Sequence, residues 1–243
     1  MTIRSAILFF ALAAAAPAPS ARGDDATNQL TIATNSFNLG VAAMHHRNFD
    51  TALAEFTLAI ELKPDYAAAF NQRGQCRGGL AHGTNDLAAL TNALADYNQA
   101  IQLDPGYAEA YFNRGIVKQI QEDYDGAFAD FSLAITNNPR FAVAYYNRGL
   151  MKVTQHDFDG AIDDYDRAIL LRADFSMAYA SRGLLKEKVN KDLTGAQADF
   201  DKSIQLRPDY YLGYQYRANL RHLQGDTNGA DADLRKAQEL QHR

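Results

Sequence analysis

The sequence predicts an all-α solenoid of six helix-turn-helix repeats, and three observations support this fold class. An Arg-Gly pair, extended in register toward both ends, recurs in steps of 34, 41, 34, 34 and 35 residues. Apolar residues within each repeat follow helical spacing rather than the alternation of a strand. Short polar residues and prolines stand at fixed places where helices would begin and end. A shared period of this length is typical of a repeat array.

Four columns of residue type define the register. The first column is small and comprises Gly40, Gly74, Gly115, Gly149, Gly183 and Ala218. The second is also small and comprises Ala52, Ala93, Ala127, Ala161, Ala196 and Ala230. The third is large and comprises Phe56, Tyr97, Phe131, Tyr165, Phe200 and Leu234. The fourth comprises Ala59, Ala100, Ala134, Ala168, Ser203 and Ala237. The small columns predict close approach of the two helices within each repeat.

The register places the six repeats at about residues 33–66, 67–107, 108–141, 142–175, 176–210 and 211–241. In the second helix of the third repeat, apolar residues from Ala127 to Ile135 recur at i, i+4, i+7 and i+8, which makes one stripe. Polar residues that can cap the second helices are Asn48, Asp123, Asp157, Asp192 and Asp226. Prolines that end the second helices are Pro64, Pro105, Pro139 and Pro208. Ala173 replaces this proline in the fourth repeat, where we expect a softer boundary.

The second repeat exceeds the 34-residue period by seven residues, which we assign to an insertion at 81–92. Ala89 stands at the usual cap position and cannot cap, whereas Asn85 and Asp86 can. We therefore expect the second helix to extend backward by about two turns. A flexible elbow is predicted at Gly78, Gly79 and Gly83. The insertion is interpreted either as a lip that contacts a partner or as a tolerated change of loop length.

The N-terminus has the pattern of a secretory leader. Arg4 supplies a positive charge, and residues 6–16 form an apolar run of eleven residues, shorter than the roughly 20 needed to span a bilayer. Cleavage after Gly23 is preferred to cleavage after Ser20, because acidic residues would then open the mature protein. Residues 1–23 are thus predicted as a signal peptide and 24–32 as a short linker. An uncleaved anchor is the alternative.

Composition excludes several classes of protein. A hydrophobic fraction of 47% and a charged fraction of 22% predict a folded protein. The net charge is -5, and removal of the leader leaves 22 cationic against 29 acidic residues. This acidic balance argues against nucleic acid as a partner. The single cysteine, Cys76, cannot form an internal disulfide, and its column is apolar elsewhere, which predicts a buried side chain.

The columns together resemble the tetratricopeptide repeat family, over roughly residues 33–240. The matching features are the paired helices, the Gly and Ala packing points, the closing proline and a large residue that opens the first helix. That large residue is Phe70, Tyr111, Tyr145, Tyr179 and Tyr214. The resemblance implies a right-handed solenoid whose first helices line the concave side. It also implies a partner that is a protein or peptide, in a protein that is not an enzyme.

Two columns of cations depart from the family pattern. The residue before the Gly is Arg73, Arg114, Arg148, Arg182 and Arg217. The position four residues further on is Arg77, Lys118, Lys152, Lys186 and Arg221. Each second helix offers an acid, at Glu55, Asp96, Asp130, Asp164, Asp199 and Asp233. We favour an Arg–Asp link between the helices of a repeat over a cationic strip for an anionic ligand.

A stripe separate from the core runs along the first helices and predicts a docking surface for a peptide or helix. Its candidate binding residues are Glu109, Phe112, Ile116, Gln119, Ile120, Val143, Tyr146, Leu150, Val153, Met177, Leu184 and Glu187. Burial of these residues between stacked repeats is the alternative. The Lys and Asn set with which some family members hold the terminal carboxylate of a partner is absent from these positions.

The six histidines form no HExxH and no i, i+4 pair, and no phosphate loop or nucleophile elbow occurs. No catalytic, metal or cofactor site is therefore predicted, and we expect no enzyme. The favoured function is an exported, periplasmic interaction scaffold, with secretion from the cell as a second destination. The alternatives are a self-assembling array, which would make the protein a homo-oligomer, and an accessory subunit of an envelope enzyme or assembly machine.

Overall fold

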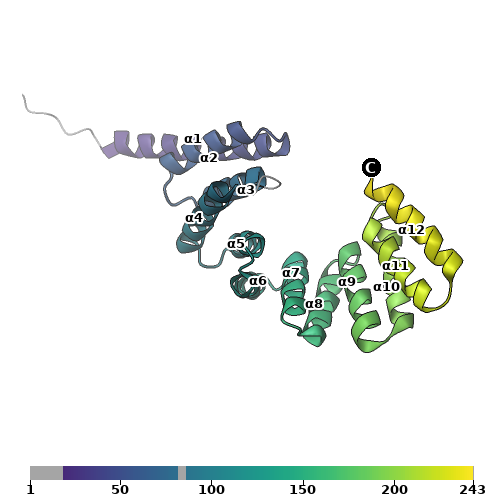
Figure 1. The fold of residues 1–243 in the computed structure, drawn as a ribbon. Coiled ribbons are helices and arrows are strands. Elements are labelled where there is room, and N and C mark those ends of the chain that lie inside the picture. The colour runs from purple at the N-terminus through teal and green to yellow at the C-terminus, as the bar shows by residue number, and fades with distance from the viewer. Residues whose placement is uncertain (1–18, 82–85, 243) are drawn as a thin grey trace, which may run out of the picture. The chain divides into compact units, whose positions relative to one another are not determined.

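A computed structural model describes residues 19–81 and 86–242, and these ranges contain twelve α-helices, one short π-helical turn and no strand (Figure 1). The helices are α1 (Pro19–His45), α2 (Phe49–Leu62), α3 (Ala67–Ala81), α4 (Leu87–Leu103), α5 (Ala108–Ile120), α6 (Tyr124–Asn137), α7 (Ala142–Thr154), α8 (Phe158–Leu171), α9 (Ser176–Leu185), the π-turn η1 (Lys186–Asn190), α10 (Leu193–Leu206), α11 (Tyr211–Leu223) and α12 (Thr227–Gln241). The predicted all-α fold of paired helices is confirmed.

The protein forms two compact units, at residues 1–65 and 66–243. In the first unit α1 packs against α2, and the rings of Phe37 and Phe56 lie 5.8 Å apart. Residues 24–32, which we expected as a linker, are helical and belong to α1. Most of the predicted leader, residues 1–18, lies outside the described residues. Among the described helices none is long and apolar enough to cross a membrane.

In the second unit, which runs from α3 to α12, each helix packs against its neighbours in the sequence within that unit. Two pairs of first helices from successive repeats also contact each other, α3 with α5 and α9 with α11. These contacts are more extensive than those between any two second helices. These two pairs place first helices of successive repeats beside each other in this unit. The five first helices α3, α5, α7, α9 and α11 form what we call the inner face.

Glycine in the first column permits the close helix contact inside a repeat. A Cβ atom on Gly115 would lie 2.8 Å from the ring of Phe131, and one on Gly149 would lie 2.7 Å from the ring of Tyr165. No side chain fits at such distances without a shift of the ring. The sixth repeat has Ala218 in this column, and it is also the repeat with Leu234 in place of a ring. The predicted close approach is confirmed.

The boundaries of the second helices follow the predicted chemistry. The caps Asn48, Asp123, Asp157, Asp192 and Asp226 each accept a hydrogen bond from the amide three residues further on. The helix α8 ends at Leu171 without a proline after it, in the same register as the other second helices. The absence of a proline at Ala173 thus leaves the end of α8 in place, and the softer boundary stays a prediction.

The insertion differs in part from expectation. Asp86 caps α4 as predicted and accepts hydrogen bonds from the amides of Ala88 and Ala89. The 17-residue α4 exceeds the 14-residue α6 by three residues, so it gains about one turn rather than two. Gly78 and Gly79 continue α3 and form no elbow, because α3 keeps its packing against α4. Gly83 lies outside the described residues.

The fifth repeat has one residue more than the fourth, and the π-turn η1 accommodates it. The spacing from Gly183 to Ala196 is 13 residues, whereas the spacing from Gly149 to Ala161 is 12. A π-helical turn absorbs one extra residue without breaking the helix. The step of 35 residues between repeats thus has a local structural cause.

Candidate functional site

Both cation columns converge on the buried aspartates of the second helices, which are only 1–4% exposed. Arg148 donates to Asp164 through Nε at 2.9 Å and Nη2 at 2.7 Å, and Lys152 Nζ lies 3.0 Å from the same carboxylate. The same arrangement occurs at Asp96, Asp130, Asp199 and Asp233. The predicted Arg–Asp link is confirmed, and the second column takes part in it.

The guanidinium groups also connect neighbouring repeats, which sequence reasoning missed. Arg182 Nη1 lies 2.6 Å from Asp166, and Arg217 Nη1 lies 2.7 Å from Asp201, each on the preceding second helix. Arg114 Nη1 donates in the same way to Asn98 at 2.7 Å. The available signal was the polar residue that follows Tyr97, Tyr165 and Phe200 in the sequence.

Hydrogen bonding holds these cations in their charged form. The hydrogen bond to Asp233 raises the pKa of Arg217, against the opposing effect of burial. The hydrogen bond to Asp130 does the same for the pKa of Arg114. Groups that are so paired inside the scaffold offer little to an anionic ligand. The inner face must therefore be judged on its other residues.

The structure places all twelve candidate binding residues on α5, α7, α9 and η1, along the inner face. Glu109 and Ile120 are exposed, and the latter side chain has 46% of its surface accessible. Glu187 is buried at 2% exposure. The remaining members are half-buried: Phe112, Ile116, Gln119, Val143, Tyr146, Leu150, Val153, Met177 and Leu184.

Stacking between repeats accounts for the half-burial of the aromatic members. The ring of Phe112 lies 5.7 Å from Phe131 in its own repeat and 5.0 Å from Phe141 at the start of the next. Tyr146 repeats this arrangement with Tyr165 and Phe175, at 5.7 Å and 4.9 Å. One side of each ring thus packs against the neighbouring rings of the scaffold, and the part of the ring that stays accessible lies on the inner face.

Glu187 lies in the π-turn with a buried carboxylate that lacks hydrogen-bond partners among the described residues. Lys188 Nζ is 2.7 Å from its Oε1, although not in hydrogen-bonding geometry. Val153 stands at the equivalent place of the fourth repeat. A carboxylate thus occupies a position that the neighbouring repeat gives to an apolar side chain, which costs stability.

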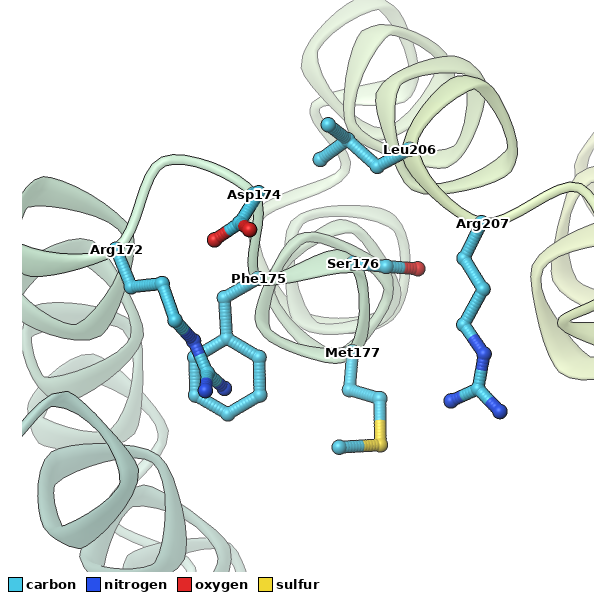
Figure 2. Close-up of a pocket in the computed structure, with 7 residues that line it drawn as sticks. All are labelled: Arg172, Asp174, Phe175, Ser176, Met177, Leu206 and Arg207. Carbon is cyan, nitrogen blue, oxygen red and sulfur yellow. The ribbon is translucent and has the colours of Figure 1, made fainter.

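Two hollows adjoin the inner face. One of about 260 Å³ lies at the start of α9, between the loop that precedes this helix and the end of α10 (Figure 2). The other, of about 210 Å³, is mostly apolar and lies among α3, α4 and α5, where Gly78 and Gly79 leave room beside Ile116 and Ile120. Cys76 is buried as predicted. Within the described ranges, no three His, Cys, Asp or Glu side chains gather closely enough to hold a metal ion.

Comparisons with known proteins agree with this geometry. A family model described as TPR repeat matches residues 89–119, which run from α4 into α5. The protein therefore has the tetratricopeptide repeat fold. The comparison with curated protein sequences found no match.

Several solved structures share the tetratricopeptide fold with this protein. PilF from Pseudomonas aeruginosa is 17% identical, with a TM-score of 0.75 over 88% of this sequence and 99% of that one. YrrB, described as a TPR protein with an unusual peptide-binding site, is 24% identical, with a TM-score of 0.59 over 76% and 92%. MamA is 24% identical, with a TM-score of 0.57 over 73% and 93%. These TM-scores support a common tetratricopeptide fold.

Proposed function

We propose that this protein, with its tetratricopeptide repeat fold, is an interaction scaffold that binds an extended peptide or a helix of a partner protein along its inner face. The observation that carries the proposal is the row of apolar side chains that remain half-exposed on α5, α7 and α9 after stacking between repeats. Accessible apolar side chains along a helix face are typical of peptide recognition. The peptide-binding site named for YrrB, which shares the fold, supports the same class of function.

We also propose that the protein acts after export, in a bacterial periplasm. The leader pattern of residues 1–23 supports export. Mass spectrometry of the mature protein from a periplasmic fraction tests this proposal, with an N-terminus at Asp24 as the expected result. An intact N-terminus on cytoplasmic protein would overturn it.

A binding role rather than catalysis is favoured by the family, whose members serve in general as interaction modules. The buried acids of the second helices are paired with cations inside the scaffold. We therefore propose a non-catalytic scaffold.

The experiment that tests the scaffold compares matched surface variants in capture of partners from an envelope extract. Ile120→Lys changes the inner face, and Leu133→Lys changes a side chain of α6 with a similar exposure, 42% against 46%. Glu109→Lys and Asp163→Lys form a second pair, on α5 and α8, and both side chains are exposed. Helicity and thermal melting should stay unchanged in all four variants.

We expect the inner-face variants to lose a partner that the parent and the α6 and α8 variants retain. The converse pattern would move the binding surface to the second helices. If the protein captures only further copies of itself, and sedimentation gives a mass larger than that of a monomer, the self-assembling array would be favoured instead.

A further inference from the structure

The hollow at the start of α9 is flanked by two arginines that occupy the same position in successive repeats. Arg172 follows the last residue of α8, and Arg207 follows the last residue of α10. The equivalent residues of the second and third repeats, Asp104 and Asn138, fold back and accept a hydrogen bond from their own loops. The arginines instead project from the scaffold. Figure 2 shows them on either side of Met177, with both guanidinium groups directed to the same side.

Each arginine is held beside an aromatic ring. The guanidinium carbon of Arg172 lies 3.5 Å from the centre of the Phe175 ring, and that of Arg207 lies 5.4 Å from the centre of the Tyr210 ring. Cation–π contacts of this kind limit the motion of a long side chain. Within the described residues no carboxylate lies within ion-pair distance of Arg172, and Arg207 uses only Nε, at 3.3 Å from Asp209.

A buried serine pair ties together the two helices whose ends frame the hollow. Ser176 Oγ lies 3.0 Å from both the carbonyl oxygen and the hydroxyl oxygen of Ser203. The first four repeats have alanine at both positions, for example Ala142 and Ala168 in the fourth. The bond joins the start of α9 to the end of α10, so it fixes the spacing between the loops that carry Arg172 and Arg207. Such preorganisation lowers the entropy lost when a ligand binds.

The residues between the arginines define the rest of the ligand. Met177 is half-buried and packs against Phe175, and its accessible part faces the hollow. In Figure 2, Asp174 and Leu206 line the side of the hollow opposite the two guanidinium groups. A carboxylate placed between the arginines would meet two planar donors, and an apolar neighbour would contact Met177.

We propose that this hollow binds an acidic side chain of the partner segment, with an adjacent apolar side chain of the same segment on Met177. The proposal rests on the proposed function and specifies the chemistry of its partner. Charge complementarity selects the occupant, because the hollow is lined by two exposed arginines whose guanidinium groups point to the same side, one on each side of Met177. Affinity should fall as salt concentration rises, since the arginines are exposed.

The test uses the methyl signals of methionine, because the protein has only four. The protein carries 13C on its methionine methyl groups, and the Met177 signal is assigned with Met177→Leu. The probe is the peptide acetyl-Gly-Leu-Glu-Leu-Glu-Gly-amide, and its control has Gln in place of both Glu. Met44 and Met151 report on the first unit and on the buried core, so they serve as internal references.

We expect the acidic peptide to shift the Met177 signal in a saturable manner and the Gln peptide to have no effect. Arg172→Gln and Arg207→Gln should each weaken binding by about tenfold, as loss of a charge-assisted hydrogen bond predicts. Arg235→Gln, on the surface of α12, removes the same charge and should leave the affinity unchanged. Ser203→Ala should weaken binding less than either arginine change.

An absent Met177 shift, an equal shift with the Gln peptide, or unchanged affinity in both arginine variants would overturn the proposal. If a partner depends on Ile120 and Glu109 for capture but not on Arg172 and Arg207, the scaffold stands and this acidic subsite does not. If neither set of variants loses capture of the partner, the scaffold itself is contradicted. Failure of the acidic subsite and failure of the scaffold therefore give different results.

Discussion

The guanidinium group of Arg217 contacts the carboxylate of Asp233 side-on, with Nε 2.9 Å from Oδ2 and Nη2 2.7 Å from Oδ1. Arg221 Nη1 reaches the same Oδ2 at 2.8 Å. One buried acid therefore pairs with two cations, and the pattern recurs through the second unit. These clusters connect the two helices of each repeat where their small residues bring them together.

Removal of one buried acid should destabilise the protein strongly. Asp164→Asn leaves Arg148 and Lys152 without a negative partner, so we expect a loss of about 3–5 kcal/mol in the free energy of unfolding. Chemical denaturation measures this loss. Asp163→Asn, at the exposed neighbour, should change stability by less than about 0.5 kcal/mol. Equal effects of the two changes would show that the cluster adds nothing to stability.

The contact between Gly115 and the Phe131 ring predicts a loss of stability that a second substitution can partly restore. Gly115→Ala should cost about 1–3 kcal/mol, because the new Cβ would lie 2.8 Å from the Phe131 ring. Phe131→Leu in the same protein reproduces the Ala218 and Leu234 pair of the sixth repeat and should recover part of the loss. A double-mutant cycle in chemical denaturation measures the coupling. Strictly additive costs would contradict the proposed contact.

The buried carboxylate of Glu187 predicts a substitution that raises stability. Glu187→Val introduces the residue of the fourth repeat and removes a group without hydrogen-bond partners, so we expect a gain of about 1–2 kcal/mol. Thermal melting and denaturant titration measure it, with Glu187→Gln as the variant that keeps the shape. A loss of stability would show that the ion pair with Lys188 outweighs the cost of burial.

Buried tyrosines predict a loss of stability at alkaline pH. Burial raises the pKa of Tyr97 and of Tyr165 above the value of about 10 for an unfolded protein. A raised pKa in the fold favours the neutral phenol, so its contribution to stability is complete below about pH 10 and declines as pH rises further. Denaturant titrations between about pH 9 and 11.5 should show this decline.

The tyrosine effect has a control within the repeats. Phenylalanine already occupies this column in two other repeats, at Phe131 and Phe200. Tyr97→Phe and Tyr165→Phe should therefore preserve packing and reduce the decline of stability at alkaline pH. Tyr124→Phe changes an exposed ring and should leave the decline unchanged. An unaltered pH profile in the first two variants would assign the decline to other groups.

Contacts inside a repeat could be predicted from the sequence because they recur at constant spacing. Arg148 and Asp164 lie 16 residues apart, as do Arg114 and Asp130, so the shared columns already indicate their link. The caps and the glycine contacts follow from the same recurrence. The length added to α4 was overestimated, because α3 continues through Gly78 and Gly79 and takes up part of the insertion.

Contacts between repeats required the tertiary structure. The sequence by itself determined the repeat period, the caps of the second helices and the internal ion pairs, since each of these recurs at constant spacing. Only the structure decided that Phe112 and Tyr146 are partly buried by stacking, that Glu187 is buried in a π-turn and that Arg172 and Arg207 line one hollow. The physical reason is that stacking depends on how successive helix pairs are rotated against each other, and no single column of residues specifies that rotation.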